Sequence, residues 1–413
     1  MIAWTEQHLM IRDAMRRFIA AEIKPRLEEL EHGDTPPYEV LRKLMTTFGL
    51  DEAERARFAH RIAREKEAEA RRARGEAVPE DGGREGGSDL DTVGMQLIPV
   101  IELCRYCPGM VTAMGVSVGL TAAAIVSKGT IAQKERWALP LLTLEKIGAW
   151  AITEPGSGSD AFGGMKSTAR RDGDGYVLNG SKTFITNGPY ADTIVFICKL
   201  DEGNDPKDRK VLTFVVERGT PGLTQSRPMR KMGLHSSPTG ELFLDDVRVD
   251  RGHLLGETED APSRAGAKQT FSMERSGVAA MALGIVEQCR DLSVDYARTR
   301  VQFGRPIGEF QLIQLKLARM EVVRMNLQNM IFRQIEMAAA GTRMELAEAS
   351  ACKLYAAQGA MEVALEAVQL FGGNGYMAEF QVEQLCRDAK VLQIYAGTDE
   401  IQVSQIARSL LAR

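Results

Sequence analysis

The sequence predicts an α+β protein that is mostly helical, with a small β-barrel-like domain between an N-terminal helical domain and a C-terminal four-helix bundle. Two changes of pattern predict this order. Apolar residues at helical spacing fill the first part of the chain and return from about residue 266, and short β-branched runs lie between them. Because 413 residues can bury several cores, we expect domains at 1–146, 147–262 and 263–413.

The N-terminal domain is expected to begin with two helices. Apolar residues recur at helical spacing from about 5 to 30, and a second helix should start after Pro36-Pro37 and run to a stop at Gly49. A charged insertion at 51–92 then interrupts the pattern, with acids and bases first and glycines afterwards. We expect a solvated helix followed by a mobile linker, with a partner-binding segment as the alternative. Closely packed helices should follow up to residue 146.

The middle domain should contain strands, because β-branched residues cluster at 193–197, 211–216 and 240–249. Two polar stretches precede them. In 150–160, proline and glycine force a turn whose backbone amides can face a ligand. In 176–188, a break at Asn179-Gly180 between alternating segments predicts a β-hairpin that presents a ring and a hydroxyl to a flat ligand such as a flavin.

The C-terminal domain should be a bundle of long amphipathic helices. The periodic stretches cover 267–299, 311–340, 344–370 and 399–411.

Composition excludes several classes of function. A net charge of −4 with 26% charged residues gives no basic footprint for nucleic acid or an anionic membrane surface. The first residues lack the order of a signal peptide, and we see no apolar run of membrane-spanning length, so we expect a cytoplasmic protein without membrane insertion. The six cysteines are scattered, and the close pair Cys104 and Cys107 fits reduced thiols better than zinc, so no metal site is expected.

Several glycine-rich and charged motifs occur in one order along the chain, and together they resemble the acyl-CoA dehydrogenase family. The resemblance covers nearly the whole chain apart from the insertion. Single motifs of this kind are weak signals, but their combined order is specific. The motifs lie at 153–160, 179–188, 300–304, 369–375, 387–390 and 395–400.

The resemblance implies FAD bound between the β domain and the bundle, in homotetramers whose subunits complete each other's flavin sites. Phe184 would replace the usual tryptophan beside the isoalloxazine, and Thr186 would lie near flavin N5. Arg300 and Gln311 would hold the pyrophosphate and adenosine of the neighbouring subunit's FAD. The cofactor positions that the resemblance implies are Trp150, Ile152, Thr153, Ser159, Phe184, Thr186, Arg300, Gln302, Phe303, Gln311, Gln369, Gly372, Gly373, Thr398 and Glu400.

The implied reaction is α,β-dehydrogenation of an acyl-CoA thioester to the trans-2-enoyl-CoA. A base takes the α proton, the β hydride passes to flavin N5, and an electron-transfer flavoprotein accepts the electrons. Many family members carry the catalytic glutamate where this chain has Ala396. The isovaleryl-CoA and long-chain branches carry it in a Glu-Arg pair, which maps to Glu274 and Arg275. Glu274 is therefore the expected base.

The thioester should meet four further positions. Arg275 would hold a CoA phosphate or order the site, and the Ala396 N–H would stabilise the enolate oxygen. The substrate positions implied are Ser159, Arg275, Ala396 and Gly397. Two alternatives remain open: a fold relative that acts as a flavin oxidase or monooxygenase, and a non-catalytic subunit of a mixed oligomer. The sequence does not predict the length or branching of the acyl chain.

Overall fold

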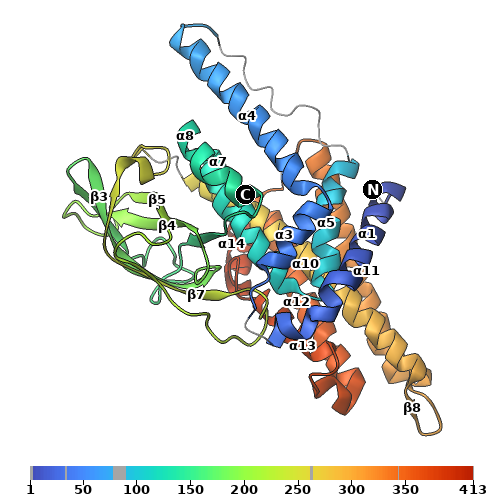
Figure 1. Cartoon of the computed structure of the whole chain (residues 1–413). Coiled ribbons are helices and arrows are strands. Elements are labelled where there is room, and N and C mark those ends of the chain that lie inside the picture. The colour runs from blue at the N-terminus through green and yellow to red at the C-terminus, as the bar shows by residue number, and fades with distance from the viewer. Residues whose placement is uncertain (1–2, 33–34, 78–89, 261–263, 343, 413) are drawn as a thin grey trace.

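The computed structural model describes residues 3–32, 35–77, 90–260, 264–342 and 344–412, without the side chains of residues 90, 92, 264–274 and 276. The expected linker around 80–88 lies outside these residues. Figure 1 shows a curled sheet domain on one side of a helical body, with one long helix projecting from that body. The predicted fold class, mostly helical with a small β domain, is confirmed.

The N-terminal helices form where apolar periodicity predicted them. Thr5 caps the first of them, because its Oγ1 accepts a hydrogen bond from the His8 N–H. The elements are α1 (Glu6–Phe18), η1 (Ile19–Ile23), η2 (Lys24–Arg26), α2 (Leu27–His32), α3 (Tyr38–Thr47), α4 (Leu50–Ala73), α5 (Leu90–Cys104), α6 (Pro108–Met114), η3 (Gly115–Ala122), α7 (Ala123–Lys128), α8 (Ile131–Gln133), η4 (Lys134–Ala138) and α9 (Leu139–Leu142).

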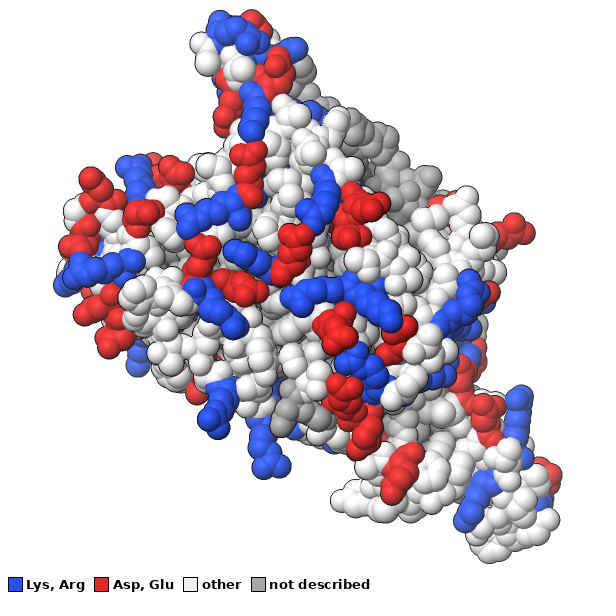
Figure 2. All heavy atoms as spheres, viewed as in Figure 1, with Lys and Arg blue, Asp and Glu red and all other residues white. Residues whose placement is uncertain are grey.

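The projecting helix is α4, the helix expected in the charged insertion. Its base is anchored because Phe58 and Ile62 are buried in a cluster with α7 and α9, and Lys134 pairs with Glu65 at 2.7 Å. Its tip carries interleaved positive and negative side chains, as the upper arm in Figure 2 shows. The tip is therefore a solvated face of mixed charge, as predicted.

The expectation that no apolar run reaches membrane-spanning length is wrong. The continuous helical run Pro108–Lys128 has 21 residues and a mean hydropathy of 1.8, which is enough by length and composition. Half of that run is buried inside the protein. Its Ser117 hydroxyl accepts a hydrogen bond from the N–H of Gly148 in the β domain at 2.9 Å. Packing within the protein thus accounts for the apolar character of this run.

The β domain is one curled seven-stranded sheet with the order β1-β4-β2-β3-β7-β6, and β5 pairs with β4. Its core combines apolar side chains from six of these strands with Ala191 and Leu254. Most neighbours are antiparallel, but β1 and β2 run parallel to β4. The strands are β1 (Gly148–Ala151), β2 (Thr168–Asp172), β3 (Gly175–Thr186), β4 (Thr193–Leu200), β5 (Val211–Glu217), β6 (Leu223–Gln225) and β7 (Thr239–Asp250).

The predicted hairpin turn at Asn179-Gly180 is wrong, because β3 continues through both residues. The register against β7 shifts there, and a Cβ atom on Gly180 would lie 2.2 Å from the Ser167 hydroxyl oxygen. The Asn179 amide instead bonds Asp246 on β7 at 3.0 Å. The Asn-Gly pair thus serves a bulge at a close approach, while the true hairpin turn joins β2 to β3 at 172–175.

The C-terminal domain contains the four predicted long helices, and one buried core joins it to the N-terminal helices. A further helix, α13, was not predicted. The elements are α10 (Arg264–Thr299), β8 (Val301–Gln302), β9 (Arg305–Pro306), η6 (Ile307–Glu309), α11 (Gln311–Ala339), α12 (Leu346–Phe371), η7 (Gly372–Tyr376), α13 (Val382–Val391) and α14 (Asp399–Leu411). The short η5 (Arg251–His253) links β7 to this domain.

Candidate functional site

A buried ion pair joins the two polar stretches that were expected to face a flat ligand. Lys182 on β3 is fully buried, and its Nζ lies 2.8 Å from Glu154 Oε1 in the turn that follows β1. The same ammonium donates to Ile152 O at 3.1 Å. The Thr183 N–H donates to Thr153 O at 2.9 Å. These bonds fix the first stretch against the second.

The pair is held in its ionised form. Burial would raise the pKa of Glu154, but hydrogen bonds from Lys182, Ser167 and Lys166 outweigh burial and lower that pKa. Burial lowers the pKa of Lys182, although the nearby carboxylate opposes that change. The ion pair is therefore a fixed part of the site's framework.

The surface above this pair offers an exposed ring and polar groups. Phe184 has a φ of 57° where β3 bulges, and its side chain is 66% exposed. Trp150, Ile152, Thr153 and Thr186 are half-buried around it, and Ser159 is exposed in the glycine-rich turn. Side chains added to Gly156 and Gly158 would meet nothing within 4 Å. An aromatic plane, hydroxyls and open backbone thus lie together, as a flat heteroaromatic ligand requires.

Asn187 ties this surface to the N-terminal domain. Its buried amide donates to Ala113 O and Gly148 O at 2.9 Å each, and it accepts from the Tyr38 hydroxyl at 2.9 Å. The end of β3 that bears Phe184 and Thr186 is therefore rigidly placed between two domains.

A second group of predicted residues lies at the far end of the bundle. Arg300 is exposed, and no ion pair of the described residues includes it. Phe303 at the tip of the β8–β9 hairpin is 93% exposed with a φ of 50°. Gln302 and Gln311 are exposed beside it. An unpaired guanidinium and an exposed ring suit a diphosphate and a base.

The glycine turn of η7 belongs to the same end of the bundle. Asn374 Nδ2 donates to the Tyr296 hydroxyl at 3.0 Å, and Phe371 stacks on Tyr296 with ring centres 4.0 Å apart. A Cβ atom added to Gly372 or Gly373 would meet nothing within 4 Å, and Gln369 is exposed nearby. The backbone there is open to close approach by a ligand.

These two groups cannot meet within one chain. Figure 1 places the β8 hairpin at the end of the bundle opposite the sheet that carries β3. A ligand that touches both Phe184 and Arg300 therefore requires two chains.

The third group surrounds the turn between α13 and α14. Ala396 has a φ of 54° and Gly397 a φ of 85°. Thr398 caps α14 by accepting from the Ile401 N–H at 3.4 Å, and Glu400 is exposed in the first helical turn. In the part of the chain that the structure describes, the Ala396 N–H donates to no protein acceptor. It is available to an oxygen atom of a ligand.

Arg275 of α10 lies against this turn. A Cβ atom on Gly397 would be 3.5 Å from its guanidinium, and its NH1 donates to the Ser350 hydroxyl at 2.8 Å. Because the Arg275 side chain is buried, its position favours ordering of the site over contact with a CoA phosphate. The backbone of Glu274 is adjacent in α10, whereas its side chain lies outside the described residues.

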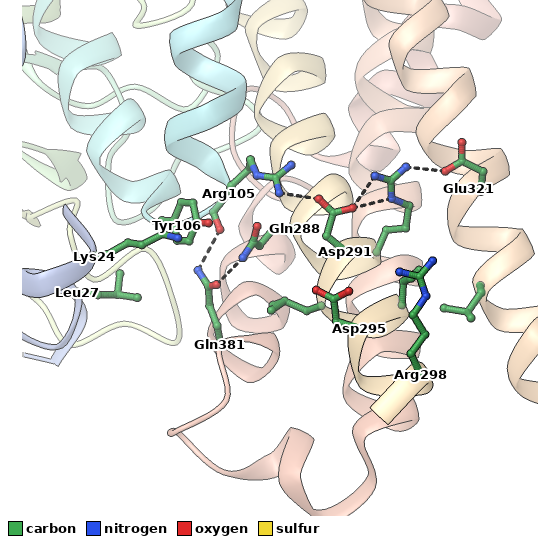
Figure 3. Close-up of a pocket in the computed structure, with 14 residues that line it drawn as sticks. Lys24, Leu27, Arg105, Tyr106, Gln288, Asp291, Asp295, Arg298, Glu321 and Gln381 are labelled. Atoms are coloured by element: carbon green, nitrogen blue, oxygen red, sulfur yellow. Dashed lines mark hydrogen bonds and ion pairs between the residues drawn. The ribbon is translucent and has the colours of Figure 1, made fainter. Parts of the chain in front are cut away.

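A groove of about 900 Å³ lies away from this site. It contains none of the predicted residues. Figure 3 shows Arg105 paired with Asp291, whose Oδ2 lies 2.6 Å from the Arg105 NH2, and Gln381 bonded to Gln288. An ion-pair network that links the end of α5 with α10 and α11 lines this groove.

Sequence reasoning missed Lys353 and Gln402, which bond the Ala396–Gly397 turn. A signal for Lys353 existed, because it falls on the buried face of α12 at helical spacing from Ala349, Ala356 and Ala360. A lysine at such a position is costly without a partner, and this marks it for attention.

The comparisons with known proteins agree with the motif order. Models of the acyl-CoA dehydrogenase N-terminal, middle and C-terminal domains match residues 5–145, 149–247 and 265–411. An acyl-CoA dehydrogenase of Bacillus subtilis is 36% identical over 98% of both chains. A 3-(aryl)acrylate reductase of Clostridium sporogenes is 34% identical over 99% of both chains. The solved butyryl-CoA dehydrogenase of Megasphaera elsdenii is 34% identical, covers 99% of both chains and superimposes with a TM-score of 0.81. The chain therefore belongs to the acyl-CoA dehydrogenase family.

Proposed function

We propose that the protein is an FAD-dependent dehydrogenase that converts an acyl-CoA thioester to its trans-2-enoyl-CoA. The observation that carries the proposal is the Ala396 N–H, which meets no described acceptor and lies in a turn packed against the Arg275 side chain of α10. Such a donor stabilises negative charge on a thioester oxygen, and the adjacent helix supplies a carboxylate.

The residues present fit FAD. Phe184 and Thr186 offer a ring and a hydroxyl to its isoalloxazine, while Arg300 and the open backbone at Gly372 and Gly373 suit its diphosphate. Since these groups lie at opposite ends of one chain, we propose that neighbouring subunits share each site, within a homotetramer. When bound, FAD supplies the hydride acceptor of the reaction.

The chain's own residues perform the proton chemistry in this proposal. Glu274 takes the α proton of the thioester, and the Ala396 N–H binds the thioester oxygen as negative charge develops there. Arg275 packs on Gly397 of the turn, and a hydrogen bond to the Ser350 hydroxyl of α12 fixes its guanidinium there. We propose that an electron-transfer flavoprotein then accepts the electrons.

The experiment is anaerobic mixing of the yellow holoenzyme with a panel of saturated acyl-CoAs. Loss of the oxidised flavin absorption with formation of the matching enoyl-CoA supports the proposal, and the best chain identifies the acyl group. Oxygen consumption with a substrate lacking CoA would instead support a flavin oxidase or monooxygenase. Purification of a colourless chain that cannot be loaded with FAD would support a non-catalytic subunit.

A second candidate follows from the Clostridium sporogenes relative, whose name describes reduction of an acrylate. Reduction of an α,β-unsaturated acid derivative is the same reaction in reverse. In such a protein, an enoyl-CoA would reoxidise the photoreduced flavin. This reoxidation would be faster than reduction of the oxidised flavin by the saturated thioester.

A further inference from the structure

Two buried side chains hold both carbonyl groups of the Ala396–Gly397 turn. The Gln402 amide on α14 donates through Nε2 to Ala396 O at 3.0 Å and to Gly397 O at 2.7 Å. The Lys353 ammonium on α12 donates to Gly397 O at 2.8 Å. Both side chains are fully buried, so water does not compete for these bonds. The orientation of the turn is therefore set by two neighbouring helices.

The turn needs such support because its backbone is unusual. The φ of 54° at Ala396 lies in the left-handed region, which an alanine seldom adopts. A strained residue persists only where its surroundings hold it. On the preceding side, the Tyr395 N–H donates to Val391 O at 3.1 Å. The peptide that carries the Ala396 N–H thus lies between two anchored segments.

Lys353 and Gln402 are less favourable for stability than apolar residues would be at the same positions. A fully buried ammonium such as that of Lys353 loses its hydration on folding. The Gln402 Oε1 is buried and accepts no hydrogen bond among the described residues. Apolar side chains of similar shape avoid both costs. What the two polar residues provide is a fixed pair of backbone carbonyls.

We propose that Lys353 and Gln402 are positioning residues that keep the Ala396 N–H directed at the thioester oxygen. The inference rests on the proposed function, because it assigns the amide to that oxygen. Neither residue needs to touch the substrate. They act by fixing the two peptides that follow Ala396, so that the Tyr395–Ala396 peptide, which carries the N–H, does not rotate when negative charge develops at the ligand.

The test uses the holoenzyme variants Lys353→Met and Gln402→Leu. Each single variant leaves one donor on Gly397 O, so the fold keeps a bonded turn. The matched control is Gln133→Leu, since Gln133 is also buried and its Nε2 donates to two turn carbonyls, Gly252 O and Leu254 O, in another part of the protein. All variants are first compared for FAD content and melting temperature.

Two readouts separate positioning from stability. We expect kcat for the best acyl-CoA to fall roughly 10- to 100-fold in both variants with KM nearly unchanged, on the scale of losing a supporting partner of a catalytic group. The second readout is the apparent pKa of bound acetoacetyl-CoA, whose enolate absorbs in the ultraviolet. It should rise by about 1 in both variants, a tenfold loss of enolate stabilisation, and stay at the wild-type value in Gln133→Leu.

The outcomes are distinct from those of the proposed function. If wild-type protein reduces its flavin with an acyl-CoA and both variants match its kcat and its bound acetoacetyl-CoA pKa, the positioning role is wrong while the dehydrogenase stands. An equal loss of kcat in Gln133→Leu would also overturn the positioning role, because reduced stability would then explain the loss in all three variants. If wild-type flavin is not reduced by any acyl-CoA, the proposed function fails and the inference fails with it.

Discussion

The backbone N–H of Leu234 donates a hydrogen bond to Asp388 Oδ1 at 2.5 Å, and this bond joins the loop between β6 and β7 to α13. Asp388 is fully buried, and Glu31 of α2 is buried next to the same loop, where Ser236 donates to its Oε1 at 2.7 Å. Burial raises the pKa of Asp388, and burial together with the Asp388 charge raises the pKa of Glu31 to about 8. All three domains therefore meet at the carboxyl groups of Glu31 and Asp388. Ionisation of both groups at once is unfavourable.

This junction should make stability depend on pH. The pKa of Glu31 rises from 4.5 to about 8, so the native state binds its proton more tightly than the unfolded state. The free energy of unfolding must then fall as pH rises through that window. At pH 8.5 we expect Glu31→Gln to have a higher urea midpoint than wild type, with a free energy of unfolding larger by roughly 1–3 kcal/mol. At pH 5 the two proteins should unfold at nearly the same urea concentration.

The control for this prediction is Glu28→Gln, an exposed glutamate on the same helix. Its urea midpoint should follow that of wild type at both pH values. A Glu31→Gln midpoint that tracks wild type across the range would show that Glu31 does not hold the proton.

The helices could be predicted because their cores are local in sequence. The expected stretch at 311–340 corresponds to Gln311–Ala339, since a helix in a bundle repeats its apolar face every three or four residues. The turn at Asn179-Gly180 could not be read correctly in this way. The same dipeptide fits a hairpin or a bulge, and the choice depends on Ser167, which approaches Gly180 only in the folded sheet.

In the candidate site, too, some residues could be predicted from local sequence, whereas others depend on contacts that form only on folding. Phe184 and Thr186 were predicted because alternation along one strand can present both on one surface and because the family resemblance places them beside a flavin. The bonds from Lys353 and Gln402 to Gly397 O span 44 and 5 positions of the chain, and a sequence does not reveal which helix faces meet. The expected branch, isovaleryl-CoA or long-chain, also stays a prediction, because it depends on the Glu274 side chain.

The buried ion pair between Lys182 and Glu154 predicts a large effect of a single substitution. Lys182→Met should leave the Glu154 carboxylate buried without its cation and lower the free energy of unfolding by about 3 kcal/mol or more. The double variant Glu154→Gln, Lys182→Met should recover part of that loss. Thermal melting of the four proteins of this cycle measures the coupling, and additive effects would exclude it.

The separation of Phe184 from the β8 hairpin predicts complementation between inactive chains. Arg300→Ala should lose FAD, and Glu274→Gln should lose the base. When the two variants assemble in equal amounts, a site is complete only if one chain supplies Glu274 and its neighbour supplies Arg300. Random assembly gives such sites in about a quarter of cases. Co-expression with two affinity tags should therefore restore about a quarter of wild-type activity. Mixed oligomers without activity would mean that each chain completes its own site.

The sharpest prediction concerns the base. Glu274→Gln should keep the yellow flavin and abolish its bleaching by acyl-CoA, because the amide cannot accept the α proton. The double variant Glu274→Gln, Ala396→Glu should recover some of the activity if the two positions reach the same α carbon. The left-handed backbone at Ala396, with a φ of 54°, is retained by either residue only under strain, so the rescue should be partial. Bleaching by Glu274→Gln at the wild-type rate would remove Glu274 from the mechanism, whereas a dead double variant that still binds acetoacetyl-CoA would show that a carboxylate at 396 does not reach the α carbon.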